Sequence, residues 1–382
     1  MSTAGIRASV ADELVTYGLS LDIHKRNHLG YPFCLKYDHA EQLAETIQDQ
    51  RYTLINIGDP FSSPIYQISS LEYERQVLGF FAELFGLDRQ PRPWWGYIGS
   101  CGTEGNLYGL LLGRLAQPEG ILYFSEAAHY SVGKAARMFR MPYRKVRSQA
   151  SGEMDYAHLA EIVESGQPVI INLTLGTTFT GAVDEIGRTV EALTGRGIGL
   201  DQVYIHVDAA LGGMIACYIR PELISFDWPI GSLAISGHKF IGCPHPCGVV
   251  LTYKETADRF SSEISAEVEY IGSTDLTIMG SRNGHTPLYL WAEIQRRKST
   301  FHLEAEAIVD KARFLHQKLS DQGLPALLNP LSSTVVFPRP PQPVIAKYQL
   351  AVQVDQAHAV IMQQHSYELL EEFAGVLGTC LG

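Results

Sequence analysis

The chain has 382 residues, of which 46% are apolar and 19% charged, a balance that is ordinary for a globular protein. Its formal net charge of −11 argues against a surface for nucleic acid or anionic membranes, and no apolar run is long enough to span a bilayer. The first residues lack the apolar core of a signal peptide, so we expect a cytoplasmic protein whose six cysteines stay reduced.

Residues 1–50 are expected to form an N-terminal helical arm. A weak helical stripe of apolar residues ends near Gly30, and a second helix is predicted over Glu41–Gln50. A turn at residues 58–60 precedes a third helix, predicted over Leu71–Phe85 from the spacing of its apolar residues. The stripe in the first helix consists of Leu14, Val15, Leu19 and Leu21.

The middle of the chain alternates short apolar runs with helical ones, which predicts β-α-β units and a mainly parallel sheet. We assign residues 51–295 to this large α/β domain. Helices are predicted over Ala157–Glu164 and Glu185–Leu193. The predicted strands are Gly120–Phe124, Pro168–Leu175, Gln202–Val207, Ser232–Ile235 and Cys247–Tyr253.

The last part of the chain, residues 296–382, is expected to form a small α+β domain. One long helical stretch is predicted over Leu288–Leu319, followed by strands over Ser333–Phe337 and Ala357–Met362 and a helix over Tyr367–Leu377. The pair Cys243 and Cys247 surrounds a histidine, but no second cysteine pair stands at zinc-site spacing. We therefore predict a rigid loop and no metal.

Lys239 follows the predicted strand Ser232–Ile235, at the edge where open α/β sheets bind their ligands. An amine among apolar groups loses its proton more easily and can attack a carbonyl. Gly102 and Thr103 come just before a predicted helix, whose first N–H groups favour a phosphate. The absence of a following Gly-Lys-Ser/Thr excludes a P-loop.

Three further groups follow other strands. His129 has a planar ring, Asp208 is a carboxylate that needs a cationic partner, and Ala210 leaves room for a flat ring. Thr177 adds a hydroxyl at the end of another strand. Together with Lys239, these groups suit pyridoxal 5′-phosphate (PLP). Lys239 would bind the aldehyde of PLP, and Asp208 would bind its ring nitrogen. His129 and Ala210 would contact the two faces of the ring. The phosphate would be bound by Thr103, Ser236 and His238.

The motifs themselves resemble those of the group II PLP-dependent amino-acid decarboxylases, in the branch of histidine decarboxylases and plant serine decarboxylases. The motifs that carry the resemblance are Gly102–Asn106, His129–Ser131, Asp208–Ala210, Ser236–Lys239 and Gly280–His285. The resemblance implies the aspartate aminotransferase-like fold type I and a homodimer with its active site at the subunit interface. It also implies a tyrosine from the partner subunit as proton donor, for which Tyr270 is the candidate by position. Tyr66 and Ser332 are candidates for contact with substrate, and Arg282 is assigned a structural role.

The substrate stays open between L-histidine, which would give histamine, and L-serine, which would give ethanolamine. An aminotransferase needs the same cofactor site, together with an arginine for the α-carboxylate, and Arg339 is the one candidate in the tail. A non-catalytic PLP-binding protein is a further alternative. A Rossmann-type nucleotide-binding protein would require Gly-x-Gly-x-x-Gly in the first β-α turn, where it is not found.

Overall fold

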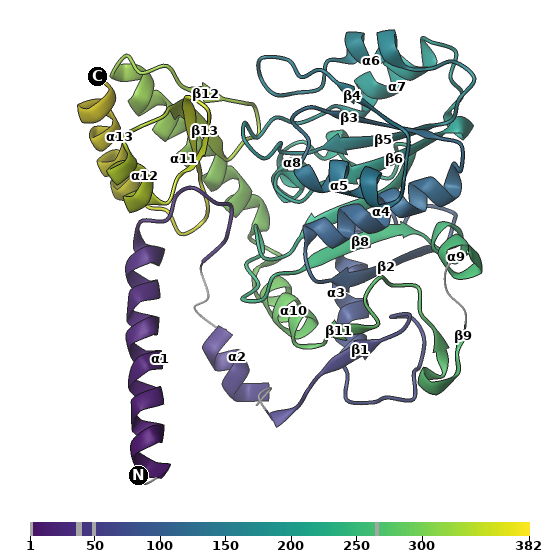
Figure 1. The fold of residues 1–382 in the computed structure, drawn as a ribbon, viewed down its shortest axis with the longest axis horizontal. Coiled ribbons are helices and arrows are strands. Elements are labelled where there is room, and N and C mark those ends of the chain that lie inside the picture. Colours follow the sequence, from purple (N-terminus) through teal and green to yellow (C-terminus); the bar gives the residue numbers. More distant parts are fainter. Residues whose placement is uncertain (1–2, 36–39, 48–50, 264–266) are drawn as a thin grey trace.

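The computed structural model describes residues 3–35, 40–47, 51–263 and 267–382. Figure 1 shows a central sheet with helices on both sides, a smaller sheet with helices near the C-terminus, and a long N-terminal helix that extends away from both. This arrangement confirms the predicted α/β fold with a mainly parallel central sheet.

The central sheet has seven strands in the order β2-β8-β7-β6-β5-β3-β4. β8 runs antiparallel to both neighbours, and the other strands run parallel to one another. The sequence analysis missed β2 and β4, the two edge strands. The strands are β2 (Trp94–Gly99), β3 (Ile121–Ser125), β4 (Tyr143–Val146), β5 (Val169–Thr174), β6 (Val203–Asp208), β7 (Ile230–Ser236) and β8 (Gly248–Tyr253).

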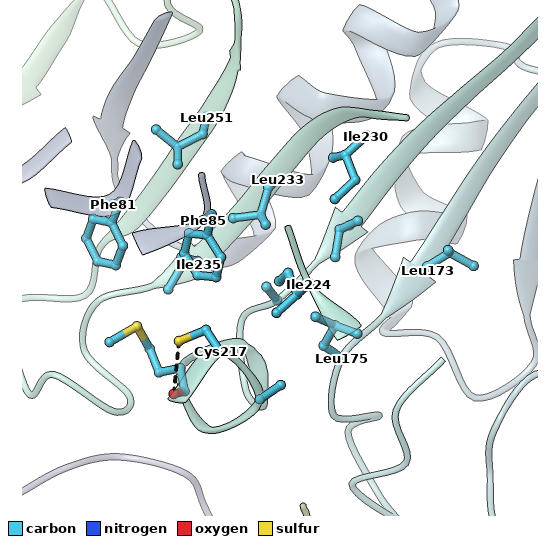
Figure 2. Packing of buried hydrophobic residues seen from close by; sticks show 14 of the residues in the cluster. Phe81, Phe85, Leu173, Leu175, Cys217, Ile224, Ile230, Leu233, Ile235 and Leu251 are labelled. Carbon is cyan, nitrogen blue, oxygen red and sulfur yellow. Dashed lines mark hydrogen bonds between the residues drawn. The ribbon is translucent and has the colours of Figure 1, made fainter. Parts of the chain in front are cut away.

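Helices cover both faces of this sheet, so its inner strands are buried on both sides and consist largely of apolar residues. Figure 2 shows one face, where Phe81 and Phe85 pack against Leu233, Ile235 and Leu251. Burial of one such side chain contributes about 1.5–3 kcal/mol. The helices are α3 (Leu71–Leu84), α4 (Gly102–Ala116), α5 (Tyr130–Met138), α6 (Tyr156–Ile162), α7 (Ile186–Thr194), α8 (Gly213–Ile219), α9 (Lys254–Glu263) and α10 (His285–Arg297).

Helix α4 lies unusually close to the sheet because glycines line its inner side. A Cβ atom at Gly105 would lie 2.8 Å from Cβ of Ala234, and one at Gly109 would lie 2.1 Å from Nδ1 of His206. Any larger residue at these positions would push the helix outward. The close packing holds the N-terminus of α4 beside the carboxyl ends of β6 and β7.

The C-terminal sheet has four antiparallel strands in the order β12-β13-β15-β14. The prediction of one continuous helix over Leu288–Leu319 is wrong, because α10 ends at Arg297 and a separate helix begins at Phe301. No glycine or proline marks this break; Arg297 spans it through ion pairs with Glu293 and Glu304. The elements are α11 (Phe301–Asp321), β12 (Leu327–Leu328), β13 (Thr334–Pro338), α12 (Gln342–Tyr348), β14 (Ala351–Gln353), β15 (Gln356–Val360) and α13 (Tyr367–Leu381).

The N-terminal helices are α1 (Thr3–Arg26) and α2 (Ala40–Ile47). The helix predicted over Glu41–Gln50 corresponds to α2, although its last three residues lie outside the described part of the chain. Among the described residues, the structure contains no helix that could span a membrane. Short elements complete the fold, namely β1 (Ile55–Ile57) paired with β11 (Ser281–Asn283), β9 (Glu267–Val268) paired with β10 (Ser273–Thr274), and the 3₁₀ helices η2 (Leu200–Gln202), η3 (Pro221–Leu223) and η4 (Glu269–Ile271).

Candidate active site

A cavity of about 430 Å³ lies where β5, β6 and β7 end and α4 begins. This is the position at which open α/β sheets bind their ligands. The lining comes from four separate parts of the chain: the segment after α1, the N-termini of α4 and α5, the strand ends, and the C-terminal sheet. The lining residues are Gly30–Phe33, Cys101–Thr103, Asn106, His129, Tyr130, Thr174, Gly176, Thr178, Asp208, Ala210, Leu211, Ser236, His238, Lys239, Ala351 and His358.

Asp208 and Lys239 lie on the same cavity because their strands are neighbours. Asp208 ends β6 and stands opposite Ala234 of β7, and Lys239 follows β7 by three residues. Burial lowers the pKa of the Lys239 amine, against the smaller opposing effect of Asp208. Asp208 is only 4% exposed, and its carboxylate accepts hydrogen bonds from the backbone N–H of Ala210 (3.1 Å) and from Nδ2 of Asn106 (2.7 Å). The site therefore combines a nucleophilic amine with a buried carboxylate.

His129 precedes α5 and caps its N-terminus. Its Nδ1 accepts a hydrogen bond from the backbone N–H of Ser131 (3.3 Å) and lies 2.8 Å from Oγ of Ser131. Burial lowers the pKa of His129, with Asp208 acting in the opposite direction. The half-buried ring of His129 therefore lines the cavity with Nδ1 already occupied.

The first turn of α4 forms the other end of the cavity. A Cβ atom at Gly102 would lie 2.5 Å from Oγ of Ser236, so only glycine leaves this space open. The carboxylate of Glu104 accepts hydrogen bonds from the backbone N–H (2.7 Å) and Oγ (2.6 Å) of Ser100 and so fixes the turn before the helix. Gly102 and Thr103 thus place a helix N-terminus, which attracts anions, at the cavity.

The structure places Thr178 at the cavity, whereas the sequence analysis chose Thr177. The Thr177 hydroxyl accepts a hydrogen bond from the backbone N–H of Ala182 (2.9 Å) and lies 2.8 Å from Oγ1 of Thr180. Both contacts belong to the turn after β5. Gly176 enters this turn with a φ of 90°, a backbone conformation that favours glycine.

The outer wall of the cavity was not predicted. The segment Gly30–Phe33 was interpreted only as a helix stop, yet its Tyr31 and Phe33 line the cavity. His358, from β15, lies with Nδ1 2.8 Å from the carbonyl oxygen of Phe179 and with Nε2 3.1 Å from that of Gly30. No local pattern joins these segments, which are more than 300 residues apart.

Three predicted site residues lie elsewhere in the single chain. Tyr270, in η4, is 85% exposed. The Tyr66 hydroxyl donates to the carbonyl of Thr53 (3.1 Å), and Oγ of the buried Ser332 accepts from the backbone N–H of Thr334 (2.9 Å). None of the three lines the cavity formed by the described residues.

Arg282 and the cysteine pair also lie outside the cavity. Arg282 forms a fully buried ion pair with Glu74 and donates to the carbonyl of Gly58 (3.0 Å), which supports the assigned structural role. Cys243 and Cys247 are buried, and the backbone N–H of Cys247 donates to Nδ1 of His238 (3.0 Å). The described residues contain no group of three or more His, Cys, Asp or Glu side chains that could hold a metal ion.

The residues at the cavity fit PLP. Lys239 offers an amine that can bind the aldehyde of PLP, and Asp208 offers a carboxylate that can pair with its ring nitrogen. The planar ring of His129 can stack on the ring of PLP. The space at Gly102, which a Cβ would fill, lies at the helix N-terminus that suits a phosphate.

Comparison with known proteins also points to a PLP-dependent protein. Residues 115–298 match the model of the pyridoxal-dependent decarboxylase conserved domain. The chain is 41% identical to serine decarboxylase 1 of Oryza sativa subsp. japonica, over 97% of this chain and 76% of that protein. It is 40% identical to histidine decarboxylase of Solanum lycopersicum (94% and 86% covered) and 39% identical to that of Vibrio campbellii (88% and 85% covered).

Solved structures agree in fold. L-methionine decarboxylase from Streptomyces sp. 590, in complex with L-methionine methyl ester, superposes with a TM-score of 0.85 at 25% identity, covering 98% of this chain and 94% of that one. The identity and coverage of the curated relatives decide the family. The chain belongs to the pyridoxal-dependent decarboxylases, as a group II amino-acid decarboxylase that uses pyridoxal 5′-phosphate.

Proposed function

We propose that this enzyme decarboxylates L-histidine to histamine. The supporting observation is the stacked aromatic wall of the cavity. The rings of Tyr31 and Phe33 both line the cavity and lie 6.1 Å apart at an interplanar angle of 6°, and the ring of His28 lies nearly parallel to both, 5.9 Å from Tyr31 and 6.1 Å from Phe33. A planar imidazole can pack against such a wall, whereas the hydroxymethyl group of serine gains little from it.

L-serine is the second candidate. The three rice serine decarboxylases are each 41% identical to this chain and match 95% to 98% of it, compared with 88% for the Vibrio campbellii histidine decarboxylase. The product would then be ethanolamine. An aminotransferase reaction is a lower alternative and would yield a keto acid in place of an amine.

The proposed roles of the cavity residues follow from their positions. PLP supplies an aldehyde that reacts with amines and a protonated ring that accepts electrons from the bond to the carboxylate. Lys239 would hold the aldehyde, and Asp208 would keep the ring nitrogen protonated. His129 and Ala210 would contact the two faces of the ring. Gly102, Thr103, Ser236 and His238 would bind the phosphate, together with Thr178 in place of Thr177.

In this proposal the cavity walls have a second role, which is that they would keep water away from the substrate's carboxylate. A poorly hydrated carboxylate loses CO₂ more readily. An arginine beside the carboxylate would stabilise its charge and oppose the loss of CO₂. Arg282 instead pairs with Glu74 in the protein interior.

We further propose that two copies of the chain form a homodimer. Helix α1 exposes several large apolar side chains, including Leu14 (65%), Leu19 (61%) and Ile23 (68%), and a second copy would cover them. The exposed Tyr270 would then reach the partner's cavity and protonate the substrate's Cα. Tyr66, which is partly exposed, and Ser332, which is buried, stay proposed substrate contacts. The cytoplasmic location stays a prediction.

The two substrates can be separated in one reaction. Purified enzyme is given equal amounts of L-histidine and L-serine, and both amines and any keto acid are measured by mass spectrometry. A kcat/KM for histidine at least about tenfold above that for serine supports the proposal. A preference for serine contradicts it, and keto acid without amine would indicate an aminotransferase.

A pair of variants tests whether the aromatic wall of the cavity selects histidine. Phe33→Ala should lower kcat/KM for histidine by roughly tenfold and change that for serine much less, because one stacking ring is lost. Phe61→Ala is the matched control, since Phe61 is similarly exposed (42% against 37%) but does not line the cavity. An equal loss for both amino acids would refute the role of the wall.

A further inference from the structure

The side chain of Asn106 connects the two cavity residues to which the proposed function assigns the cofactor ring. Its Nδ2 donates to Oδ2 of Asp208 (2.7 Å) and to Oγ of Ser131 (2.9 Å), which in turn contacts His129. We propose that Asn106 is a positioning residue that fixes the hydrogen bonds of Asp208 and His129 together and keeps the His129 proton on Nε2. This inference rests on the proposed use of both residues at the cofactor.

The orientation of the Asn106 amide is determined by its surroundings. An amide has two N–H donors and one acceptor oxygen. The carboxylate of Asp208 can only accept, so the amide nitrogen must face it, and Oδ1 then lies 3.1 Å from Nε2 of His206. A reversed amide would set two oxygens against each other at 2.7 Å, inside the protein.

His206 secures this orientation from the other side. It is fully buried, and burial lowers its pKa to about 4, so the ring is neutral and carries one proton. That proton must sit on Nε2, which donates to Oδ1 of Asn106. Nδ1 then accepts from the hydroxyl of Ser232, at 2.8 Å. The hydrogen bond from Ser232 thus fixes the tautomer of His206, and Nε2 holds the amide oxygen of Asn106.

The effect reaches His129 through Ser131. Since Oγ of Ser131 already accepts from Asn106, its own proton is free to point at Nδ1 of His129, 2.8 Å away. The backbone N–H of Ser131 donates to the same Nδ1. With two donors facing it, Nδ1 stays unprotonated, and the proton of the neutral ring lies on Nε2. Nε2 is the one ring nitrogen left for the cavity, so His129 presents an N–H donor there.

The test uses the chain without cofactor, labelled with ¹⁵N-histidine. Protonated and unprotonated ring nitrogens differ widely in chemical shift, and the His129 signals are identified by their loss in His129→Gln. The wild-type chain should show a protonated Nε2 and an unprotonated Nδ1. The opposite assignment overturns the proposal, whatever the enzyme's substrate proves to be.

Asn106→Asp removes the donor to Ser131 and keeps an oxygen for His206, while the new carboxyl group and that of Asp208, 2.7 Å apart, share one proton. The new carboxylate accepts the Ser131 proton, so Oγ of Ser131 becomes an acceptor and the His129 proton should move toward Nδ1. Affinity for PLP, measured by its absorbance or fluorescence, should fall by roughly tenfold or more. Ser131→Ala is the milder variant and should give a mixture of both protonation patterns; unchanged His129 signals in both variants overturn the proposal.

Asn56→Asp is the matched control. Asn56 is a buried asparagine that also donates to a carboxylate at 2.7 Å, that of Glu74, but it does not line the cavity. The same substitution there should change neither the His129 signals nor the affinity for PLP by more than about twofold. Equal effects in both variants would mean that a general loss of packing, and not Asn106, is responsible.

Discussion

The carboxyl edge of the central sheet and the segment around Tyr270 differ in how far a single chain completes them. At the sheet edge, Asp208, His129 and Lys239 line one cavity, and buried neighbours hold the first two in place. Tyr270, by contrast, is 85% exposed. One chain thus contains every group that we assign to the cofactor, while the group that we assign to protonation of the substrate's Cα would come from a second chain.

This contrast explains which site residues could be predicted from the sequence. Lys239 and Asp208 each follow a buried strand, and the carboxyl ends of neighbouring parallel strands meet at one edge. Local patterns therefore place both side chains in space. Substrate contacts have no such local signal, since they depend on loops and on a partner, and Tyr66 and Ser332 were chosen only for their places in an early loop and near the tail.

The largest effect is expected at the completed half of the site. Lys239→Ala should lower kcat on the order of 10⁴-fold or more, the scale seen when a covalent catalytic group is lost, because Lys239 is the one lysine among the described residues that line the cavity. Steady-state amine production measures it, and absorbance shows whether the cofactor is still covalently bound. Lys145→Ala, at an exposed position of β4, is the control and should keep full activity. Substantial activity without Lys239 would end the proposed mechanism.

Tyr270→Phe tests the proposed proton donor, which a single chain does not bring to its own cavity. Removal of a proton donor should lower amine formation by about 10²–10³-fold, while binding of PLP stays within twofold or so because Tyr270 does not line the cofactor cavity. Tyr143→Phe, at another exposed tyrosine, is the control. The sharper experiment mixes Tyr270→Phe chains with Lys239→Ala chains. If Tyr270 acts on the partner's cavity, mixed dimers recover activity that neither variant has alone, and no recovery would contradict that role.

Other parts of the structure show where sequence patterns fall short in the fold. The break between α10 and α11 carries no glycine or proline, and ion pairs of Arg297 with residues on both sides stabilise it. Thr178 lines the cavity, whereas the hydroxyl of Thr177, the residue chosen from the sequence, contacts Ala182 and Thr180 within the turn after β5. In both cases the contacts come from the folded chain, and apolar periodicity does not report them.

A charge on the exposed side of α1 should weaken the proposed dimer. Leu14→Glu puts a carboxylate in each chain where burial of one leucine would contribute about 1.5–3 kcal/mol, so with two leucines lost per dimer the dissociation constant should rise by roughly 10²- to 10⁴-fold. Sedimentation over a range of concentrations measures it, and activity should fall on dilution together with the dimer. Thr16→Glu adds the same charge at an exposed polar position of α1 and is the control. A dimer of unchanged strength in Leu14→Glu would remove α1 from the interface.

The smallest expected effect is a change in stability with pH, and it comes from a second buried carboxylate near the cavity. Asp184 is fully buried and accepts hydrogen bonds from the backbone N–H groups of Met154 and Thr174, both at 2.8 Å. Thr174 lines the cavity at the end of β5, so Asp184 helps to anchor the completed half of the site. Burial outweighs these two hydrogen bonds and raises the pKa of Asp184 to about 7.

Because the pKa of Asp184 is raised in the folded protein, the free energy of unfolding should fall as pH rises. In the unfolded chain the carboxyl titrates near its ordinary value of about 4, so between about pH 4 and 7 the folded protein binds more protons than the unfolded one. The stability that the protonated Asp184 contributes is therefore fully present below about pH 4 and is lost as pH rises through 7. Asp184→Asn removes this titration, so the difference in melting temperature, wild type minus variant, should be larger by roughly a few degrees at about pH 5 than at about pH 8. Asp155→Asn, at the half-buried cap of α6, serves as control. A difference that stays constant with pH would show that Asp184 is already ionised in the folded protein, and that its two backbone donors outweigh its burial.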